Sequence, residues 1–197
     1  MKVTKLAKKG KGKYKVSFDN GDDLTLYEDV IVNNVLFENK IVDQEMFKNI
    51  QKQNEESSIY HLALKYINVR QRSEKELKKY LSNKNFDLKL INLAVSKLKE
   101  EGYIDDYRFA SSYINDKINL SNHGVYKIVK DLENFGIDEK IVKELTGKID
   151  DTLIKEKIDK IIEKQKKINT KYSGRVLKTK ILNHLINLGY DKGVVIS

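Results

Sequence analysis

The chain has 197 residues, with 38 Lys and Arg against 29 Asp and Glu, a net charge of +9, and neither Cys nor Pro. The absence of Cys excludes disulfides, thiolate metal ligands and a Cys nucleophile. No run of about eighteen apolar residues occurs, so the sequence predicts a cytoplasmic protein without a membrane anchor. The basic excess favours an anionic partner, either nucleic acid or an acidic protein surface.

Residues 1–56 are typical of a small β-hairpin or meander module followed by a linking helix. Apolar and polar residues alternate over 14–18 and again over 24–26, with Asn20-Gly21 between the two runs, and this pattern favours a hairpin. Residues 3–7 are expected to add a third strand. The loop predicted over 8–13 holds four Lys and two Gly, and it is either a solvated turn or a phosphate contact. Apolar residues at helical spacing over 43–54 predict the linking helix.

A three-residue corner recurs along the rest of the chain. Its copies are Asn85-Phe86-Asp87, Gly136-Ile137-Asp138 and Gly189-Tyr190-Asp191. Each combines a residue that tolerates a left-handed helix stop, an apolar residue and an Asp that can cap the next helix. An apolar β-branched residue follows four positions after each Asp, which is the spacing of a hydrophobic staple. A period of about fifty residues predicts a mainly α fold, a tandem array of three three-helix repeats after the β module.

We place the repeats at residues 57–105, 106–150 and 151–197, after the module and linking helix at 1–56. The module is electrically neutral, whereas the repeats carry net charges of +4, −1 and +6. The last repeat has little room after its corner, so its final helix is expected to be short. The repeats share their buried apolar stripes but differ in charge. We therefore expect the functional residues at positions where the repeats differ.

The residues around the first repeat admit both structural and binding interpretations. Ser73 and Glu76 have the spacing of a capping box, and Asp105 or Asp106 can cap the next helix. Arg70 and Arg72 can favour a helix dipole or reach an anionic partner, and both interpretations stay open. Neighbouring carboxylates on a helix point about 100° apart, which argues against a catalytic or metal-binding pair at Asp105-Asp106.

The third repeat carries the strongest candidate binding surface. Ten Lys or Arg and three acids lie between Lys155 and Lys180, and Tyr172 stands among bases in a loop. Lysines on a solvated face are the default interpretation, but aromatic and basic residues together also suit contact with a nucleic-acid backbone and stacking on bases. The candidate partner-binding or nucleic-acid-binding residues are Arg70, Arg72, Lys157, Lys160, Lys164, Lys166, Lys167, Lys171, Tyr172 and Arg175.

The sequence predicts neither catalysis nor a cofactor nor a metal site. His61, His123 and His184 have no spacing that pairs them with one another or with a nucleophile. Gly10-Lys11-Gly12 lacks the remaining residues of a phosphate-binding P-loop. We therefore expect a protein that is not an enzyme.

Two stretches resemble the signature sequences of the RecX regulatory proteins. They are Arg70-Gln71-Arg72-Ser73-Glu74-Lys75-Glu76-Leu77 and the segment from Leu98 through Gly102-Tyr103-Ile104-Asp105-Asp106-Tyr107-Arg108-Phe109-Ala110. The resemblance covers most of the chain and implies three tandem three-helix units. It departs from the family pattern at Asn85, where Gly is usual, and at Asn187-Leu188, where basic residues are common.

This resemblance implies a bacterial modulator, usually an inhibitor, of the RecA recombinase. Such a protein would lie in the groove of the RecA filament on single-stranded DNA, with roles in DNA recombination, DNA repair and the SOS response. Two hypotheses follow. The first is a monomeric regulator that binds RecA filaments and modulates recombination and the RecA ATPase and co-protease activities, with possible direct contact to single- or double-stranded DNA. The second is a stand-alone nucleic-acid-binding helical module.

Overall fold

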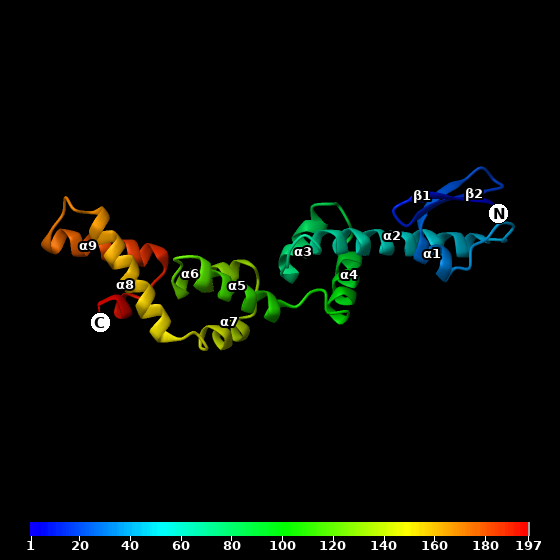
Figure 1. The fold of residues 1–197 in the computed structure, drawn as a ribbon. Helices are drawn as coiled ribbons and strands as arrows, with labels where there is room; N and C mark the ends of the chain where they lie inside the picture. Colours follow the sequence, from blue (N-terminus) through cyan, green and yellow to red (C-terminus); the bar gives the residue numbers. More distant parts are fainter. Residues whose placement is uncertain (197) are drawn as a thin grey trace. The chain divides into compact units, whose positions relative to one another are not determined.

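The computed structural model describes residues 1–196, which form three strands and ten helices (Figure 1). They divide into two compact units: the first comprises Met1–Gln71 and Leu77–Tyr103, and the second comprises Arg72–Glu76 and the described residues from Ile104 onward. The predicted fold class is confirmed, because the chain is mainly helical with a small antiparallel sheet at its N-terminal end.

The sheet is a meander of β1 (Val3–Gly10), β2 (Lys13–Phe18) and β3 (Asp23–Tyr27) in that spatial order. The alternation in β2 and β3 buries one face, which packs with α1 (Glu28–Asn33) and the start of the next helix in one apolar cluster. The loop predicted at 8–13 is instead mostly strand, because β1 continues to Gly10 and the turn is the two residues Lys11 and Gly12. The sequence did not predict α1, whose six residues are too few to show a helical period.

The helix α2 (Gln44–Ile67) is 24 residues long and is capped by Asp43, whose side chain accepts a hydrogen bond from the Met46 N–H at 2.7 Å. It joins two elements that the sequence suggested were separate, the linking helix and the first helix of the first repeat. Residue 56, where we divided the module from that repeat, therefore lies inside a continuous helix. The polar run at 55–58 contains neither Gly nor Pro, so nothing in it stops the helix.

The rest of the first repeat consists of α3 (Glu74–Ser82) and α4 (Leu88–Glu100). In the first unit, the rings of Tyr66 on α2 and Tyr80 on α3 stack at 3.9 Å between centroids. The apolar stripe of α4 packs toward α2 through Ile91, Val95 and Leu98, which are all buried. These stripes follow the i, i+4, i+7 pattern of an amphipathic helix.

The second repeat consists of α5 (Asp106–Leu120), α6 (Val125–Asn134) and α7 (Glu139–Thr146). The third consists of α8 (Asp151–Ile168), α9 (Gly174–Leu188) and the short α10 (Lys192–Ile196). Side chains from both repeats share one apolar cluster, so neither repeat buries its core alone.

The three corners have closely similar local geometry. Their first residues have positive φ angles of 60° at Asn85, 78° at Gly136 and 88° at Gly189. The Asp carboxylates then accept hydrogen bonds from the start of the next helix. Asp87 and Asp138 each accept one at 2.8 Å from the N–H two residues on, and Asp191 accepts from the N–H groups of Gly193 and Val194. Such a bond satisfies an N–H that has no partner within its helix.

The second corner packs against the start of α3. The Ser73 hydroxyl, which is fully buried, donates a hydrogen bond of 2.8 Å to the carbonyl of Phe135, the residue before Gly136. A Cβ atom added to Gly136 would lie 2.9 Å from the Cβ of Lys75. Glycine is therefore needed at this corner for close approach as well as for its φ angle.

The third corner packs against the start of α6 in the same way. The carbonyls of Leu188 and Gly189 accept hydrogen bonds from the N–H groups of Gly124 and Tyr126 at 2.7 and 3.0 Å. A Cβ atom on Gly189 would lie 2.6 Å from the backbone nitrogen of Lys127. Asn85 at the first corner is exposed, so Asn can replace Gly there and needs only to tolerate the left-handed conformation.

The contact at Gly189 can be tested against a matched glycine. Gly189 and Gly102 both have positive φ, but a Cβ on Gly102 would meet no atom within 4 Å. Both Gly→Ala variants should lose about 1 kcal/mol of unfolding free energy from backbone strain. Gly189→Ala should lose a further 1 to 3 kcal/mol or so, because its methyl group overpacks the contact. Urea unfolding measures both, and equal losses would show that the contact contributes no stability.

The shared core gives a second prediction. Leu132 is fully buried, whereas Leu120 in the same repeat is 82% exposed. Leu132→Ala should lower the unfolding free energy by about 2 to 5 kcal/mol because it removes buried methyl groups and leaves a cavity. Leu120→Ala should change it by less than about 0.5 kcal/mol. Thermal and urea denaturation of the two variants, compared with the unsubstituted protein, check both values.

Candidate partner-binding surface

Seven of the ten candidate residues lie in the third repeat and are exposed. The apolar residues Ile154, Ile158 and Ile161 bury one stripe of α8, which leaves most of its lysines on the solvated face. The residues that follow are exposed in the loop after α8 and in the first turn of α9. We call this set the basic surface: Lys160, Lys164, Lys166, Lys167, Lys171, Tyr172 and Arg175.

Acidic neighbours offset little of this charge. Lys166 and Glu163 form an ion pair at 2.8 Å, and Lys166 holds the pKa of the Glu163 carboxyl below its usual value. Both side chains are more than half exposed, so water screens the pair and it contributes little stability. The ten bases and three acids between Lys155 and Lys180 leave the segment strongly positive.

Tyr172 lies in the loop that joins α8 to α9, with 41% of its surface exposed. The amine of Lys180 on α9 lies 4.3 Å from the centroid of the Tyr172 ring, within the range of a cation–π interaction. Lys180 is not among the candidate residues predicted from the sequence, because the loop between α8 and α9 determines which lysine reaches the ring. A partly exposed aromatic ring beside cations can stack on a nucleic-acid base while the cations contact phosphate.

The start of α9 adds to the positive potential of this surface. Ser173 occupies the N-cap position but makes no side-chain hydrogen bond to the helix, and no acidic residue lies in the first turn. At α2, α4 and α5, by contrast, Asp side chains accept hydrogen bonds from the first N–H groups. The N–H groups at the start of α9, with Arg175 in the first turn, can therefore receive an anionic oxygen.

Lys157 lies on α8 but serves the fold. Its amine donates hydrogen bonds to the carbonyl oxygens of Ile118 and Ser121 at the end of α5, the latter at 2.8 Å. Burial, together with the nearby charge of Lys160, lowers the pKa of Lys157. A cation at a helix C-terminus satisfies carbonyl groups that have no partner within the helix. We therefore leave Lys157 out of the basic surface.

The two arginines of the first signature stretch lie apart from the basic surface in the sequence and have local partners. Arg70 donates to the carbonyl of Gln71 at 2.8 Å. Arg72 is mostly buried and lies 3.5 Å from the carboxylate of Glu76. Glu76 and Ser73 exchange hydrogen bonds in the geometry of a capping box. Arg72 thus supports the start of α3, while Arg70 is exposed and belongs to the first unit.

The second signature stretch is also explained by structure. Asp105 caps α5 by accepting a hydrogen bond from the Arg108 N–H at 2.9 Å. Asp106 accepts one from the N–H of Glu74, also at 2.9 Å. The Tyr107 hydroxyl donates to Glu144 on α7, and Phe109 and Ala110 are buried in the core. The carboxylates of Asp105 and Asp106 therefore bond to different helix starts.

The histidines occupy separate environments. His61 stacks on Tyr27 and lies 3.7 Å from the carboxylate of Asp29. The pKa of His123 is lowered by burial and by the charges of nearby lysines. Residues 1–196 contain no group of three His, Asp or Glu side chains placed to hold a metal ion. None of the helices over that range is both long and apolar enough to cross a membrane.

Comparisons with known proteins agree with this architecture. A family profile described as the first three-helix domain of RecX matches residues 60–98, and one described as the second three-helix domain matches residues 105–145. The regulatory protein RecX of Streptococcus agalactiae serotype Ia is 35% identical over 191 residues, which cover 97% of this chain and 73% of that protein. RecX of Streptococcus pneumoniae serotype 19F is 31% identical over 192 residues, 97% of this chain and 73% of that protein.

Solved structures show the same fold. A crystal structure of regulatory protein RecX matches with a TM-score of 0.83 at 23% identity, over 98% of this chain and 96% of that one. RecX from Lactobacillus salivarius matches with a TM-score of 0.68 at 26% identity, over 73% of this chain and 93% of that one.

The corners, the shared core of the second and third repeats and the exposed basic surface define a tandem helical-repeat protein with one strongly basic face. The near full-length similarity to curated relatives then gives its family. The chain belongs to the RecX family of regulatory proteins, whose members are named as regulators and not as enzymes.

The basic surface leads to a direct prediction for DNA binding. Reversing Lys164, Lys166, Lys167 and Arg175 to Glu should weaken binding to single-stranded DNA and leave helicity intact, because all four side chains are exposed. The slope of log affinity against log salt should become shallower by up to about 3, the loss of four phosphate contacts. Fluorescence anisotropy of a labelled oligonucleotide measures the slope, and circular dichroism checks the helicity.

A matched control separates position from net charge. Lys48, Lys89, Lys130 and Lys140 are also exposed but lie outside the basic surface. Their reversal to Glu changes the net charge by the same amount. Equal loss of DNA binding in the two variants would show that overall charge, and not this surface, determines the affinity.

Proposed function

We propose that this protein binds filaments of the RecA recombinase and inhibits recombination and the RecA ATPase and co-protease activities. Membership of the RecX family is the observation that supports this proposal most strongly. The resemblance of the two signature stretches to that family implies RecA as the partner. Recombinational DNA repair and control of the SOS response would then be the cellular processes affected, within the bacterial cytoplasm.

The charge distribution supports an approach to a filament that carries DNA. In this proposal the exposed lysines of the basic surface meet phosphates of the bound strand, and the start of α9 receives one of them. The middle repeat has a net charge of −1, so it has no comparable attraction for DNA. The three repeats, taken as residues 57–105, 106–150 and 151–197, would then contact the filament differently. We propose that one monomer acts at each site.

A second candidate function is that of a stand-alone nucleic-acid-binding module. The exposed ring of Tyr172, with the amine of Lys180 beside it, favours this alternative. Under it, the affinity for DNA in the absence of RecA should be high and should fall steeply with salt. Under the first proposal, inhibition of RecA should occur well below the concentration at which the protein coats bare DNA.

An ATPase titration tests the first proposal. RecA filaments on single-stranded DNA should lose ATPase activity as the purified protein is added, because bound protein occupies the filament. The variant with Lys164, Lys166, Lys167 and Arg175 changed to Glu should need about tenfold more protein for half inhibition, which corresponds to about 1.4 kcal/mol of lost binding free energy. The control reversal of Lys48, Lys89, Lys130 and Lys140 should inhibit as the unsubstituted protein does.

One result would contradict the proposed function, and another would contradict the proposed contact surface. If the unsubstituted protein leaves the ATPase unchanged at concentrations below those that coat bare DNA, the proposed function is wrong. If it inhibits and the basic-surface variant inhibits equally well, the contact lies elsewhere on the chain.

A further inference from the structure

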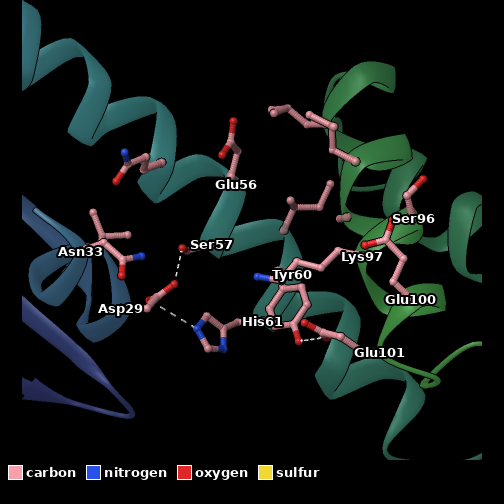
Figure 2. A pocket seen from close by; sticks show the side chains of 16 residues that line it. Asp29, Asn33, Glu56, Ser57, Tyr60, His61, Ser96, Lys97, Glu100 and Glu101 are labelled. Atoms are coloured by element: carbon pink, nitrogen blue, oxygen red, sulfur yellow. Dashed lines mark hydrogen bonds and ion pairs between the residues drawn. The ribbon is translucent and has the colours of Figure 1, made fainter.

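The first unit contains a groove of about 890 Å³ lined by residues of α1, α2 and α4 (Figure 2). One wall comes from α2 and α1 and includes Glu56, Ser57 and Asp29. The other comes from α4 and includes Ser96 and Glu100. Lys97 of α4 extends toward Tyr60 of α2, as Figure 2 shows. None of these residues belongs to the basic surface.

One apolar side chain that lines the groove is exposed to solvent. Leu93 is 59% exposed, although it follows the buried Ile91 and precedes the buried Ala94 on α4. It faces the groove beside Leu90, which is partly exposed, and the buried Ile59 of α2 forms part of the floor. Exposed leucines are common on protein surfaces, but one that lines a groove can be covered by a binding partner.

The charge of the groove is opposite to that of the chain. Its lining holds four acidic residues, one lysine and His61, which lies 3.7 Å from Asp29, whereas the whole chain has a net charge of +9. The lysine, Lys97, has its amine 4.6 Å from the centroid of the Tyr60 ring. The acidic residues are Asp29, Glu56, Glu100 and Glu101.

Neutral groups hold two of the carboxylates in place without cancelling their charge. The Ser57 hydroxyl donates a hydrogen bond to Asp29 at 2.6 Å, and the Tyr60 hydroxyl donates one to Glu101. Burial and the adjacent Glu101 raise the pKa of Tyr60, so its hydroxyl stays protonated. Glu56 lies 4.0 Å from Lys52, and both side chains are substantially exposed. The groove therefore presents fixed negative charge around an apolar side chain.

We propose that this groove binds a basic amphipathic helix of the protein partner. An apolar residue of that helix covers Leu93, and lysines or arginines one turn away meet Glu56 and Glu100. Helix-in-groove recognition uses such anchors at i, i+3, i+4 and i+7. Nucleic acid is excluded as the occupant because its phosphates would be repelled by four carboxylates.

The assignment of the partner rests on the proposed function, in which the partner is RecA. The basic surface and the groove then have separate tasks. The basic surface contacts the DNA of the filament, and the groove contacts the protein. Binding to RecA without DNA should therefore depend on the groove, and binding to DNA without RecA should not.

A charge-reversal pair tests this separation. Glu56→Lys with Glu100→Lys changes two groove residues, and Glu55→Lys with Glu133→Lys changes two exposed acids outside it. Both double variants gain the same net charge, and Glu55 is the immediate neighbour of Glu56 on α2. Leu93→Ser tests the apolar contact without removing a buried side chain. Circular dichroism and thermal unfolding confirm that all variants fold.

Binding to purified RecA without DNA is measured by biolayer interferometry. The groove double variant and Leu93→Ser should each bind at least about tenfold more weakly than the unsubstituted protein, equivalent to about 1.4 kcal/mol. The control should bind within about twofold of it. For a single-stranded oligonucleotide without RecA, the groove double variant and the control should have equal affinities.

The outcomes distinguish this inference from the proposed function. If the unsubstituted protein inhibits the RecA ATPase and the groove variants still bind RecA as the control does, the groove inference is overturned and the proposed function stands. If the unsubstituted protein neither binds nor inhibits RecA, both are overturned. If sedimentation shows self-association that the groove variants abolish, the occupant is a second copy of this chain, and the assignment to RecA is wrong.

Discussion

The packing of the repeats depends on one constraint: backbone groups at the helix ends need hydrogen-bond partners. The hydrogen bond from the buried Ser73 hydroxyl to the carbonyl of Phe135 is an example. A helix start and a helix end each leave backbone groups without partners, and burying such groups unsatisfied costs free energy. Here a helix end and a helix start are partners: the Phe135 carbonyl, at the corner that ends α6, accepts a hydrogen bond from Ser73, the residue that caps α3. The same exchange recurs where the Gly124 N–H donates to the carbonyl of Leu188 at 2.7 Å. Ser73 uses its side chain and Gly124 its backbone, so one packing arrangement is satisfied by two different residues.

This exchange requires the backbones to approach closely, which explains where glycine is needed. Gly136 and Gly189 face the start of a preceding helix, and each would place a Cβ inside contact distance of it. Asn85 is exposed and keeps only the left-handed conformation of the corner. Asn is thus compatible with the first corner. Most residues of the signature stretches likewise cap, pack or bridge helices. Differences in function between repeats must then come from the solvent-facing residues.

Periodicity and capping chemistry predicted the class of fold, the three repeats and the corner geometry, because these depend on residues close together in the sequence. They did not predict the fusion of two helical patterns into α2, since a polar run without Gly or Pro looks like a linker but does not stop a helix. The basic surface follows from lysine spacing alone, whereas the use of Lys157 to close α5 depends on a contact 39 residues away. The pairing of Lys180 with Tyr172 depends on a loop conformation. The groove on α2 and α4 combines acids from three helices, and no local pattern in the sequence joins them.

If the proposed function holds, the two surfaces of opposite charge would respond differently to a nucleoprotein filament. The potential of a polyanion extends over about a Debye length, near 8 Å at physiological salt, before specific contacts form. It attracts the lysines of the third repeat and repels the carboxylates around Leu93. Each surface would respond by itself: the basic surface would be attracted to DNA, and the groove would be repelled by phosphate. Electrostatic bias of this kind raises association rates and rejects wrong orientations more than it adds affinity. Under the same proposals, raising the salt concentration would weaken the charge contacts of both surfaces but not an apolar contact at Leu93, so binding at the groove would lose less affinity with salt than binding at the basic surface.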